Sequence, residues 1–275
     1  TSGKTTTTGM AGFILKEAGL DPTINNGGIF RNYARENPYS TAFVGKGDVF
    51  VSEIDESDGI DAVCAFEPSI AVLHNVTLDH QPMEELRAMF SGFLSKTRTA
   101  IINTQDPIVL ELAKGFKGEV LTYGAEGADL TAAHIQHYAD GVGATIVCCG
   151  EKHALKMKVP GAHNISNALA ALLAAQAAGV PLAKGVQTLS RFEGIRRRME
   201  VVGTKNDITV MDDFAHNPDK IAATISALKA FPGRLHIFFQ PHGFGFLKML
   251  GEELAQTFTE SLSKDDRLYF VEPLY

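Results

Sequence analysis

The chain of 275 residues has 45% hydrophobic and 21% charged residues, a globular composition that excludes disordered and fibrous proteins. A net charge of −7 and the lack of an apolar run of about 20 residues argue against nucleic-acid and membrane partners. Cys64, Cys148 and Cys149 form no CxxC pair and no even-numbered disulfide framework, so we expect a reduced, cytoplasmic protein.

Helical and extended patterns alternate through the first part of the chain. Residues 4–18 and 83–94 have helical spacing. Residues 48–53, 69–74 and 100–103 are short apolar runs typical of buried strands. Because such alternation is typical of βαβ units, the sequence predicts an α/β fold with a mostly parallel sheet.

Residues 130–159 follow a different pattern, in which polar and apolar residues alternate around two turns. This pattern predicts two hairpins of a small antiparallel sheet. An Ala- and Leu-rich helix over residues 163–178 follows, and Gly179 closes it.

A second α/β unit begins near Arg198, and we place the domain boundary between residues 193 and 194. Pro218 opens one of its helices, where a missing N–H group is tolerated. The predicted strands are residues 200–202, 208–211, 234–239 and 267–271, and the predicted helices are 218–230 and 248–258.

Both ends of the chain fall within expected elements. A Gly-Lys-Thr loop normally follows a buried strand, and the chain starts at Thr1, inside the loop. Residues 268–275 form a strand pattern that should lead on to a further element. We therefore expect this chain to be a piece of a longer protein.

The segment Ser2-Gly3-Lys4-Thr5-Thr6 matches the end of a phosphate-binding loop. Glycine lets backbone N–H groups approach a phosphate, lysine neutralises its oxygens, and a threonine hydroxyl reaches Mg²⁺. The positive end of the following helix points at the same place. The alternative is a frayed, Thr-rich terminus. This interpretation is weaker, because a predicted helix follows the segment.

Acidic and histidine residues follow two of the predicted strands. Glu53 opens the run Glu-Ile-Asp-Glu-Ser-Asp, and the pair Asp79-His80 follows the next strand. Carboxylates at the end of a parallel strand lie where α/β proteins bind ligands, and Mg²⁺ requires such oxygens. His80 could hold a second metal or orient a substrate. An isolated acidic run would favour a solvated loop, but this run comes one strand after the phosphate-binding segment, which favours a metal site. A structural or exposed role explains the histidine equally well.

Two asparagines open the Ala-rich helix. Asn164 and Asn167 are three residues apart and therefore share a face of the helix. Their amides both donate and accept hydrogen bonds, so they could read a nucleotide base. Helix capping is the alternative, and it explains one asparagine better than two.

Two further motifs lie at and beyond the proposed boundary. Arg198 ends a run of three arginines, and Asp213, His216 and Asn217 belong to the segment Asp-Asp-Phe-Ala-His-Asn-Pro between a strand and a helix. Taken singly, a solvated basic linker and an ordinary helix N-cap explain them better than a binding site does.

Taken together and in this order, the motifs resemble those of the Mur ligase family, ATP-dependent enzymes of cytoplasmic peptidoglycan precursor synthesis. The resemblance covers nearly the whole chain. The acidic motif and Gln240-Pro-His242 are most similar to the branch of UDP-N-acetylmuramate–L-alanine ligases and murein tripeptide ligases. The motifs are the GKTTT loop, Glu-x-Asp-Glu-Ser-Asp, Asn-x-x-x-Asp-His, Gly-x-His-Asn-x-x-Asn-Ala-Leu-Ala-Ala, Phe-x-Gly-x-x-x-Arg-x-Glu and Asp-Asp-Phe-Ala-His-x-Pro.

The resemblance implies a P-loop ATPase domain over residues 1–193 and an incomplete, Rossmann-like domain over residues 194–275. A domain that binds the UDP-sugar substrate would precede Thr1. The implied reaction joins an amino acid or peptide to a UDP-N-acetylmuramate-type carboxylate through an acyl phosphate, with ATP and Mg²⁺.

Residue roles follow from the matching positions. Lys4, His80 and Arg198 would be catalytic, and Arg198 would arrive from the second domain as the domains close. Thr5, Glu53 and His80 would bind metal. The implied nucleotide-binding set is Ser2, Gly3, Lys4, Thr5, Thr6, Asn164, Asn167, Arg198, Asp213, His216 and Asn217.

The sequence also departs from the family pattern. Gly243-Phe-Gly-Phe stands where Arg-Phe-x-Arg is usual in the alanine-adding branch, so two cations expected near the substrate are missing. No lysine matches the carbamylated metal-binding lysine of some Mur enzymes, which fits that branch. Two alternatives therefore stay open: a Mur-like ligase that acts outside cell-wall synthesis, and a P-loop ATPase or nucleotide-binding module without ligase activity.

Overall fold

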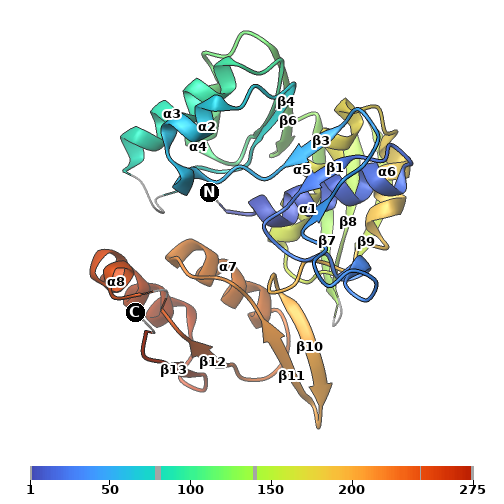
Figure 1. The fold of residues 1–275 in the computed structure, drawn as a ribbon. Helices are drawn as coiled ribbons and strands as arrows, with labels where there is room; N and C mark the ends of the chain where they lie inside the picture. Colours follow the sequence, from blue (N-terminus) through green and yellow to red (C-terminus); the bar gives the residue numbers. More distant parts are fainter. Residues whose placement is uncertain (1, 78–81, 139–140, 242, 274–275) are drawn as a thin grey trace. The chain divides into compact units, whose positions relative to one another are not determined.

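The computed structural model describes residues 2–77, 82–138, 141–241 and 243–273 (Figure 1). The chain divides into two compact units, residues 1–200 and 201–275. Both are mixed α/β structures, which confirms the predicted fold class.

The first unit is built on a six-stranded sheet in the order β4-β5-β6-β7-β8-β9 (Figure 1). Strands β4 to β7 pair in parallel and β7 to β9 pair antiparallel. The predicted hairpins are therefore present, but they extend the parallel sheet and do not form a separate one. The strands are β4 (Ile70–Leu73), β5 (Thr99–Asn103), β6 (Glu119–Gly124), β7 (Leu130–Tyr138), β8 (Gly141–Cys148) and β9 (Glu151–Met157).

Helices pack against both faces of this sheet, and strand β5 shows why. Successive side chains of a strand point to opposite faces. Ile101 belongs to the core formed with α1 (Lys4–Glu17), α5 (His163–Ala177) and α6 (Leu182–Leu189). Ala100 and Ile102 belong to a second core. That core is formed with α2 (Ile60–Ala65), α3 (Met83–Ser95) and α4 (Pro107–Ala113).

The first unit also contains a three-stranded sheet in the order β2-β1-β3. Strand β1 (Thr23–Asn25) pairs antiparallel with β2 (Ala42–Phe43) and in parallel with β3 (Phe50–Ser52). The strand predicted at residues 48–53 therefore belongs to this sheet and not to the larger one. Two short 3₁₀ helices, η1 (Arg31–Tyr33) and η2 (Glu56–Asp58), complete the region.

The second unit contains a βαβ motif. Strands β12 (His236–Phe239) and β13 (Arg267–Phe270) pair in parallel, and α8 (Phe244–Ser261) connects them. Helix α7 (Pro218–Lys229) packs with α8 around a small core. Strands β10 (Glu200–Lys205) and β11 (Ile208–Asp212) form a separate two-stranded sheet. The buried core residues are Ile221, Ile225, Phe239, Leu254 and Phe258.

Residues 194–200, which we assigned to the second domain, contact the first unit. Arg31 donates its N–H to the Gly194 carbonyl at 3.0 Å, and Arg196 donates to the Ile29 carbonyl at 2.9 Å. Ile195 is buried and forms a β-bridge with Phe30. These backbone contacts group the segment with residues 1–193.

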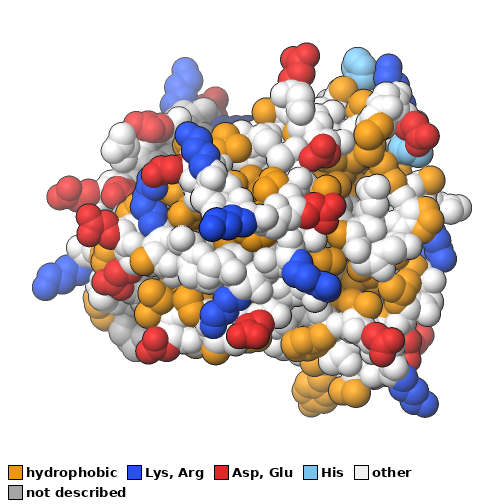
Figure 2. All heavy atoms as spheres, turned by 90° about the horizontal axis from the view of Figure 1, so that it is seen from above, with side chains coloured by type: hydrophobic (Ala, Val, Ile, Leu, Met, Phe, Trp, Pro, Cys, Tyr) orange, Lys and Arg blue, Asp and Glu red, His pale blue; other side chains and the backbone are white. Residues whose placement is uncertain are grey.

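Charges of both signs are mixed on the surface. On the face shown in Figure 2, acidic and basic side chains are interspersed, with hydrophobic side chains between them. Among the residues that the structure describes, no helix is both long enough and apolar enough to span a membrane.

Candidate functional site

The phosphate loop turns sharply at Gly3, the N-cap of α1. Its φ of 84° lies in the left-handed region that favours glycine, and a Cβ there would lie 2.4 Å from Asn167 Oδ1. Asn75 fixes the loop backbone from the end of β4: its Oδ1 accepts from the Ser2 N–H at 2.7 Å, and its Nδ2 donates to the Ser2 carbonyl at 2.9 Å. The first N–H groups of a helix lack intrahelical partners, so this fixed turn presents an anion-binding end.

Lys4 reaches two carboxylates of the acidic run. It forms an ion pair with Glu56, whose side chain is 1% exposed, and lies 3.6 Å from Asp55 Oδ2. Burial by itself raises the pKa of Asp55, but the hydrogen bond from Ser57 and the charge of Lys4 outweigh it and lower that pKa. The ammonium of Lys4 is thus held in a defined position.

Thr5 connects Glu53 to Arg198. Its hydroxyl donates to Glu53 Oε1 at 2.8 Å and accepts from Arg198 Nη2 at 3.1 Å. The other oxygen of Glu53 accepts from the Gly27 N–H at 2.8 Å, which orients the carboxylate. The structure therefore brings together a hydroxyl, a carboxylate and a guanidinium at the start of α1, where Thr6 is buried.

Asn164 and Asn167 lie in the first turns of α5 and do not cap it. The N-cap is Ala162, without a side-chain hydrogen bond. Asn167 Nδ2 donates to Asn164 Oδ1 at 2.9 Å, and Asn164 Nδ2 donates to the Pro160 carbonyl at 2.6 Å. Asn167 Oδ1 also accepts from Thr7 of α1 at 3.3 Å. Both amides are buried, and through Asn167 they fix α5 against the phosphate-loop helix.

Two histidines near the loop are neutral at physiological pH. Burial lowers the pKa of His74 to about 3 and that of His163 to about 4. His74 follows β4, its Nδ1 is hydrogen-bonded to the hydroxyl of Tyr123, and the two rings stack with centroids 5.8 Å apart. Neither histidine adds positive charge to the loop.

The motif of the second unit has its own hydrogen bonds. Asn217 is the N-cap of α7, where its Oδ1 accepts from the Lys220 N–H at 2.9 Å, as the capping alternative predicts. Asp213 Oδ1 accepts from the Ala215 N–H at 2.7 Å. His216 Nδ1 lies 3.0 Å from the Phe214 carbonyl, so it carries a proton, and Nε2 faces Lys220 Nζ at 3.3 Å.

The predicted metal ligands are only partly described. His80 lies outside the described residues. Within the described part of the chain, no group of three or more His, Cys, Asp or Glu side chains could hold a metal ion. Thr5 and Glu53 are therefore the predicted metal-binding residues that the structure places side by side.

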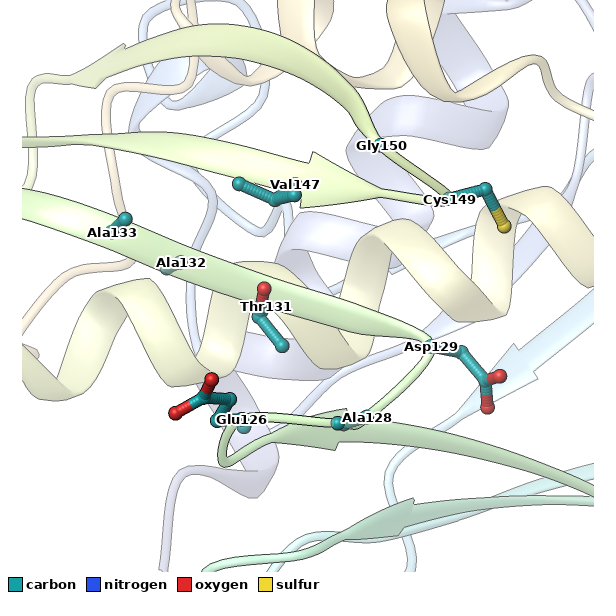
Figure 3. A pocket seen from close by; sticks show the side chains of 11 residues that line it. Glu126, Ala128, Asp129, Thr131, Ala132, Ala133, Val147, Cys149 and Gly150 are labelled. Atoms are coloured by element: carbon teal, nitrogen blue, oxygen red, sulfur yellow. The ribbon is translucent and has the colours of Figure 1, made fainter.

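A hollow of about 420 Å³ lies elsewhere, beside the connection from β6 to β7 and the turn after β8 (Figure 3). Glu126, Asp129 and Cys149 line it, and its described lining includes no lysine or arginine. Asp129 is already hydrogen-bonded to Thr122 at 2.7 Å. An acidic hollow of this kind does not suit a triphosphate, and none of the predicted site residues line it.

Comparison with family sequence models decides the family. The Mur ligase middle domain matches residues 1–175, and the Mur ligase glutamate ligase domain matches residues 197–274. The chain belongs to the Mur ligase family. The predicted family resemblance is confirmed.

Individual relatives are consistent with this assignment to the Mur ligases. The chain is 37% identical over 269 residues to the UDP-N-acetylmuramate–L-alanine ligase of Desulforamulus reducens, covering 94% of this chain and 56% of the relative. It is 36% identical to the same enzyme of a Nostoc species, covering 95% and 54%. The solved UDP-N-acetylmuramate–alanine ligase of Thermotoga maritima superposes with a TM-score of 0.78 at 27% identity, over 100% of this chain and 66% of that one. The chain thus spans little more than half the length of these curated relatives.

Three residues at the loop were not singled out from the sequence. Glu56 lies inside the acidic run, but its pairing with Lys4 crosses 52 positions. Asn75 opens the motif Asn-x-x-x-Asp-His, and this position directly after β4 was the available signal. His74 precedes it, and nothing in the sequence separates it from an ordinary histidine after a strand.

Proposed function

We propose that this chain forms the nucleotide-binding part of an ADP-forming amide ligase of peptidoglycan precursor synthesis or recycling. The observation that supports it most is the cluster at the start of α1, where Thr5 bridges Glu53 and Arg198 next to Lys4. The matched relatives that act on UDP-N-acetylmuramate and L-alanine support the substrate class. On this proposal residues 1–193, with the segment 194–200 packed on them, are the ATP-binding domain, and residues 201–275 are part of the ligase domain.

The residues present fit ATP and Mg²⁺. A Cβ on Gly3 would collide with Asn167 Oδ1 at 2.4 Å, so glycine is what allows the turn that leads into α1, whose positive N-terminal end suits a phosphate. The Thr5 hydroxyl and the Glu53 carboxylate, 2.8 Å apart, are hard oxygen donors of the kind that bind Mg²⁺ together with phosphate oxygens. When bound, Mg²⁺ would neutralise charge on the phosphates.

Buried polar atoms support the same fit. Ser2 Oγ and Glu56 Oε1 are buried, and neither has a hydrogen-bond partner among the residues that the structure describes. Buried polar groups without partners are costly and rare in folded proteins. Both atoms belong to the loop or to the acidic run that holds Lys4.

The chemistry of the proposed reaction needs charge neutralisation. The substrate carboxylate attacks the γ-phosphate of ATP, ADP leaves, and the product is an acyl phosphate. The amine then attacks the acyl carbon, and inorganic phosphate leaves. Negative charge accumulates in the first step, where Lys4 and Arg198 would stabilise it. Arg198 is held next to the loop by Thr5, so it is positioned before the substrate arrives.

The test uses the complete protein that carries this sequence. Lys4→Ala should abolish ADP release that depends on both a UDP-N-acetylmuramate-type acceptor and an amino acid. Lys46→Ala, at an exposed position, is the matched control and should retain it. Product mass identifies the acceptor and the amine, which the Gly243 departure leaves open. ADP release that needs no amine would favour a nucleotide-binding ATPase, and turnover retained by Lys4→Ala would refute the proposed role of the loop.

A further inference from the structure

His74 places one edge of its ring against the phosphate loop. A Cβ built on Gly3 would lie 3.1 Å from both Cδ2 and Nε2 of His74. His74 is half-buried, and no hydrogen-bond partner for Nε2 is found among the described residues. The polar atom on this edge is therefore available to a ligand of the loop.

Tyr123 decides which nitrogen of His74 carries the proton. The side chain of Tyr123 is fully buried, and His74 Nδ1 is the partner that the described residues give its hydroxyl. If the hydroxyl oxygen accepted a hydrogen bond from an Nδ1–H group, the phenol's own O–H would stay buried and unpaired, which is costly. If the Tyr123 hydroxyl instead donates its hydrogen to Nδ1, the buried O–H group has a partner. Nδ1 then accepts, and in a neutral ring Nε2 carries the hydrogen.

The surroundings keep both rings in these forms. Burial lowers the pKa of His74 to about 3, so the imidazole is neutral at physiological pH. Burial, with the nearby charge of Asp106, raises the pKa of Tyr123 well above its usual range, so the phenol keeps its proton. The stacked arrangement of the rings and the hydrogen bond from Asn103 Nδ2 to the His74 carbonyl at 2.9 Å fix the orientation.

We propose that the Nε2–H of His74 donates a hydrogen bond to a phosphate of the nucleotide bound by the Gly-Lys-Thr loop, and that Tyr123 is a positioning residue that keeps the proton on Nε2. This inference rests on the nucleotide binding proposed above. The ligand class is a nucleoside diphosphate or triphosphate. A neutral donor supplies directionality where Lys4 and Arg198 supply charge.

The test measures nucleotide affinity separately from ligase activity. Isothermal titration of the complete protein that carries this sequence, with ADP and with adenosine, compares wild type with four variants. His74→Phe keeps an aromatic ring without the donor and should weaken ADP binding by at least about tenfold, the lower bound for one hydrogen bond to a charged group. His74→Gln keeps an N–H group and should stay within about twofold of wild type. Adenosine affinity should not change in either variant.

Two tyrosine variants test the positioning role. Tyr123→Phe removes the hydroxyl that orients His74 and should weaken ADP binding about threefold, because the wrong tautomer becomes populated. Tyr138→Phe is the matched control, since its hydroxyl bonds to Gln136 at 2.7 Å and not to His74. Nitrogen-15 NMR of the imidazoles, assigned by the signal lost in His74→Phe, should show the proton on Nε2 in wild type and a mixture in Tyr123→Phe.

The outcomes separate the two proposals. Unchanged ADP affinity in a folded His74→Phe variant, or a proton found on Nδ1 in wild type, overturns the role of His74 and leaves the proposed function intact. Parallel loss of adenosine binding also overturns it, because that indicates a damaged pocket. Failure of the complete wild-type protein to bind ADP overturns the nucleotide-binding proposal and this inference with it. Circular dichroism establishes that each variant is folded.

Discussion

The ion pair between Lys4 and Glu56 gives the sharpest prediction for stability. The side chain of Glu56 is 1% exposed and that of Lys4 is 21% exposed, so the pair is half-way between a buried and a surface ion pair. Lys4→Met keeps most of the side-chain volume but leaves the Glu56 carboxylate without that cation. Breaking a buried pair costs about 3–5 kcal/mol and breaking a surface pair at most about 1 kcal/mol. We therefore expect Lys4→Met to lower the free energy of unfolding by about 2–3 kcal/mol.

A double-mutant cycle measures this effect. Urea unfolding, followed by far-ultraviolet circular dichroism, compares wild type with Lys4→Met, Glu56→Gln and the double variant. The double variant should recover at least about 1 kcal/mol relative to the sum of the two single effects. Arg87→Met removes the cation of an exposed pair with Glu111 and should cost less than about 1 kcal/mol. Additive single effects, or a Lys4→Met cost no greater than that of Arg87→Met, would refute the reasoning.

Two further predictions concern the loop glycine and the second unit. Gly3→Ala should lower the free energy of unfolding by at least about 2 kcal/mol more than Gly19→Ala, measured by urea unfolding. Both residues have a left-handed φ, but a Cβ on Gly3 would collide with Asn167, whereas a Cβ on Gly19 would meet nothing within 4 Å. Equal losses of unfolding free energy in the two variants would contradict this prediction. The interaction with Lys229 and backbone hydrogen bonds hold the pKa of Asp266 below its value in the unfolded chain. The Asp266 carboxylate therefore stabilises the fold fully above about pH 4, and this stabilisation is lost as the pH falls further. Asp266→Asn should flatten the decline of the thermal unfolding midpoint in acid, and an unchanged decline would exclude this carboxylate as its cause.

The fold was predictable where local pattern and neighbouring segments agree. The helix expected at residues 163–178 is α5, since its Ala- and Leu-rich sequence is helical by itself and is buried between α1 and the sheet. Strand β1 was not predicted, because three residues between Pro22 and Asn26 carry no readable period. The merging of the antiparallel strands with the parallel sheet depends on two residue pairs between β6 and β7, which no local pattern encodes.

Some residues of the candidate site were likewise predictable from the sequence, and others were not. Lys4, Thr5 and Glu53 were predictable because loop chemistry and strand ends identify such residues one at a time. Their partners were not, since the hydrogen bond from Arg198 to Thr5 joins positions 193 residues apart. Only the folded chain selects which of several nearby acids and amides meets the loop. The roles of Asp213, His216 and Asn217 in nucleotide binding stay predictions.

The attachment of residues 194–200 to the first unit has a consequence for preorganisation. Backbone hydrogen bonds join this segment to residues 29 and 31, and the guanidinium of Arg198 donates to the Thr5 hydroxyl, so contacts within the first unit hold this cation beside the loop. Folding has already reduced the conformational entropy of the Arg198 side chain, so the side chain loses little further entropy when an anion binds. A chain shortened after residue 200 should therefore keep this cation in place and retain its contribution to the proposed nucleotide binding.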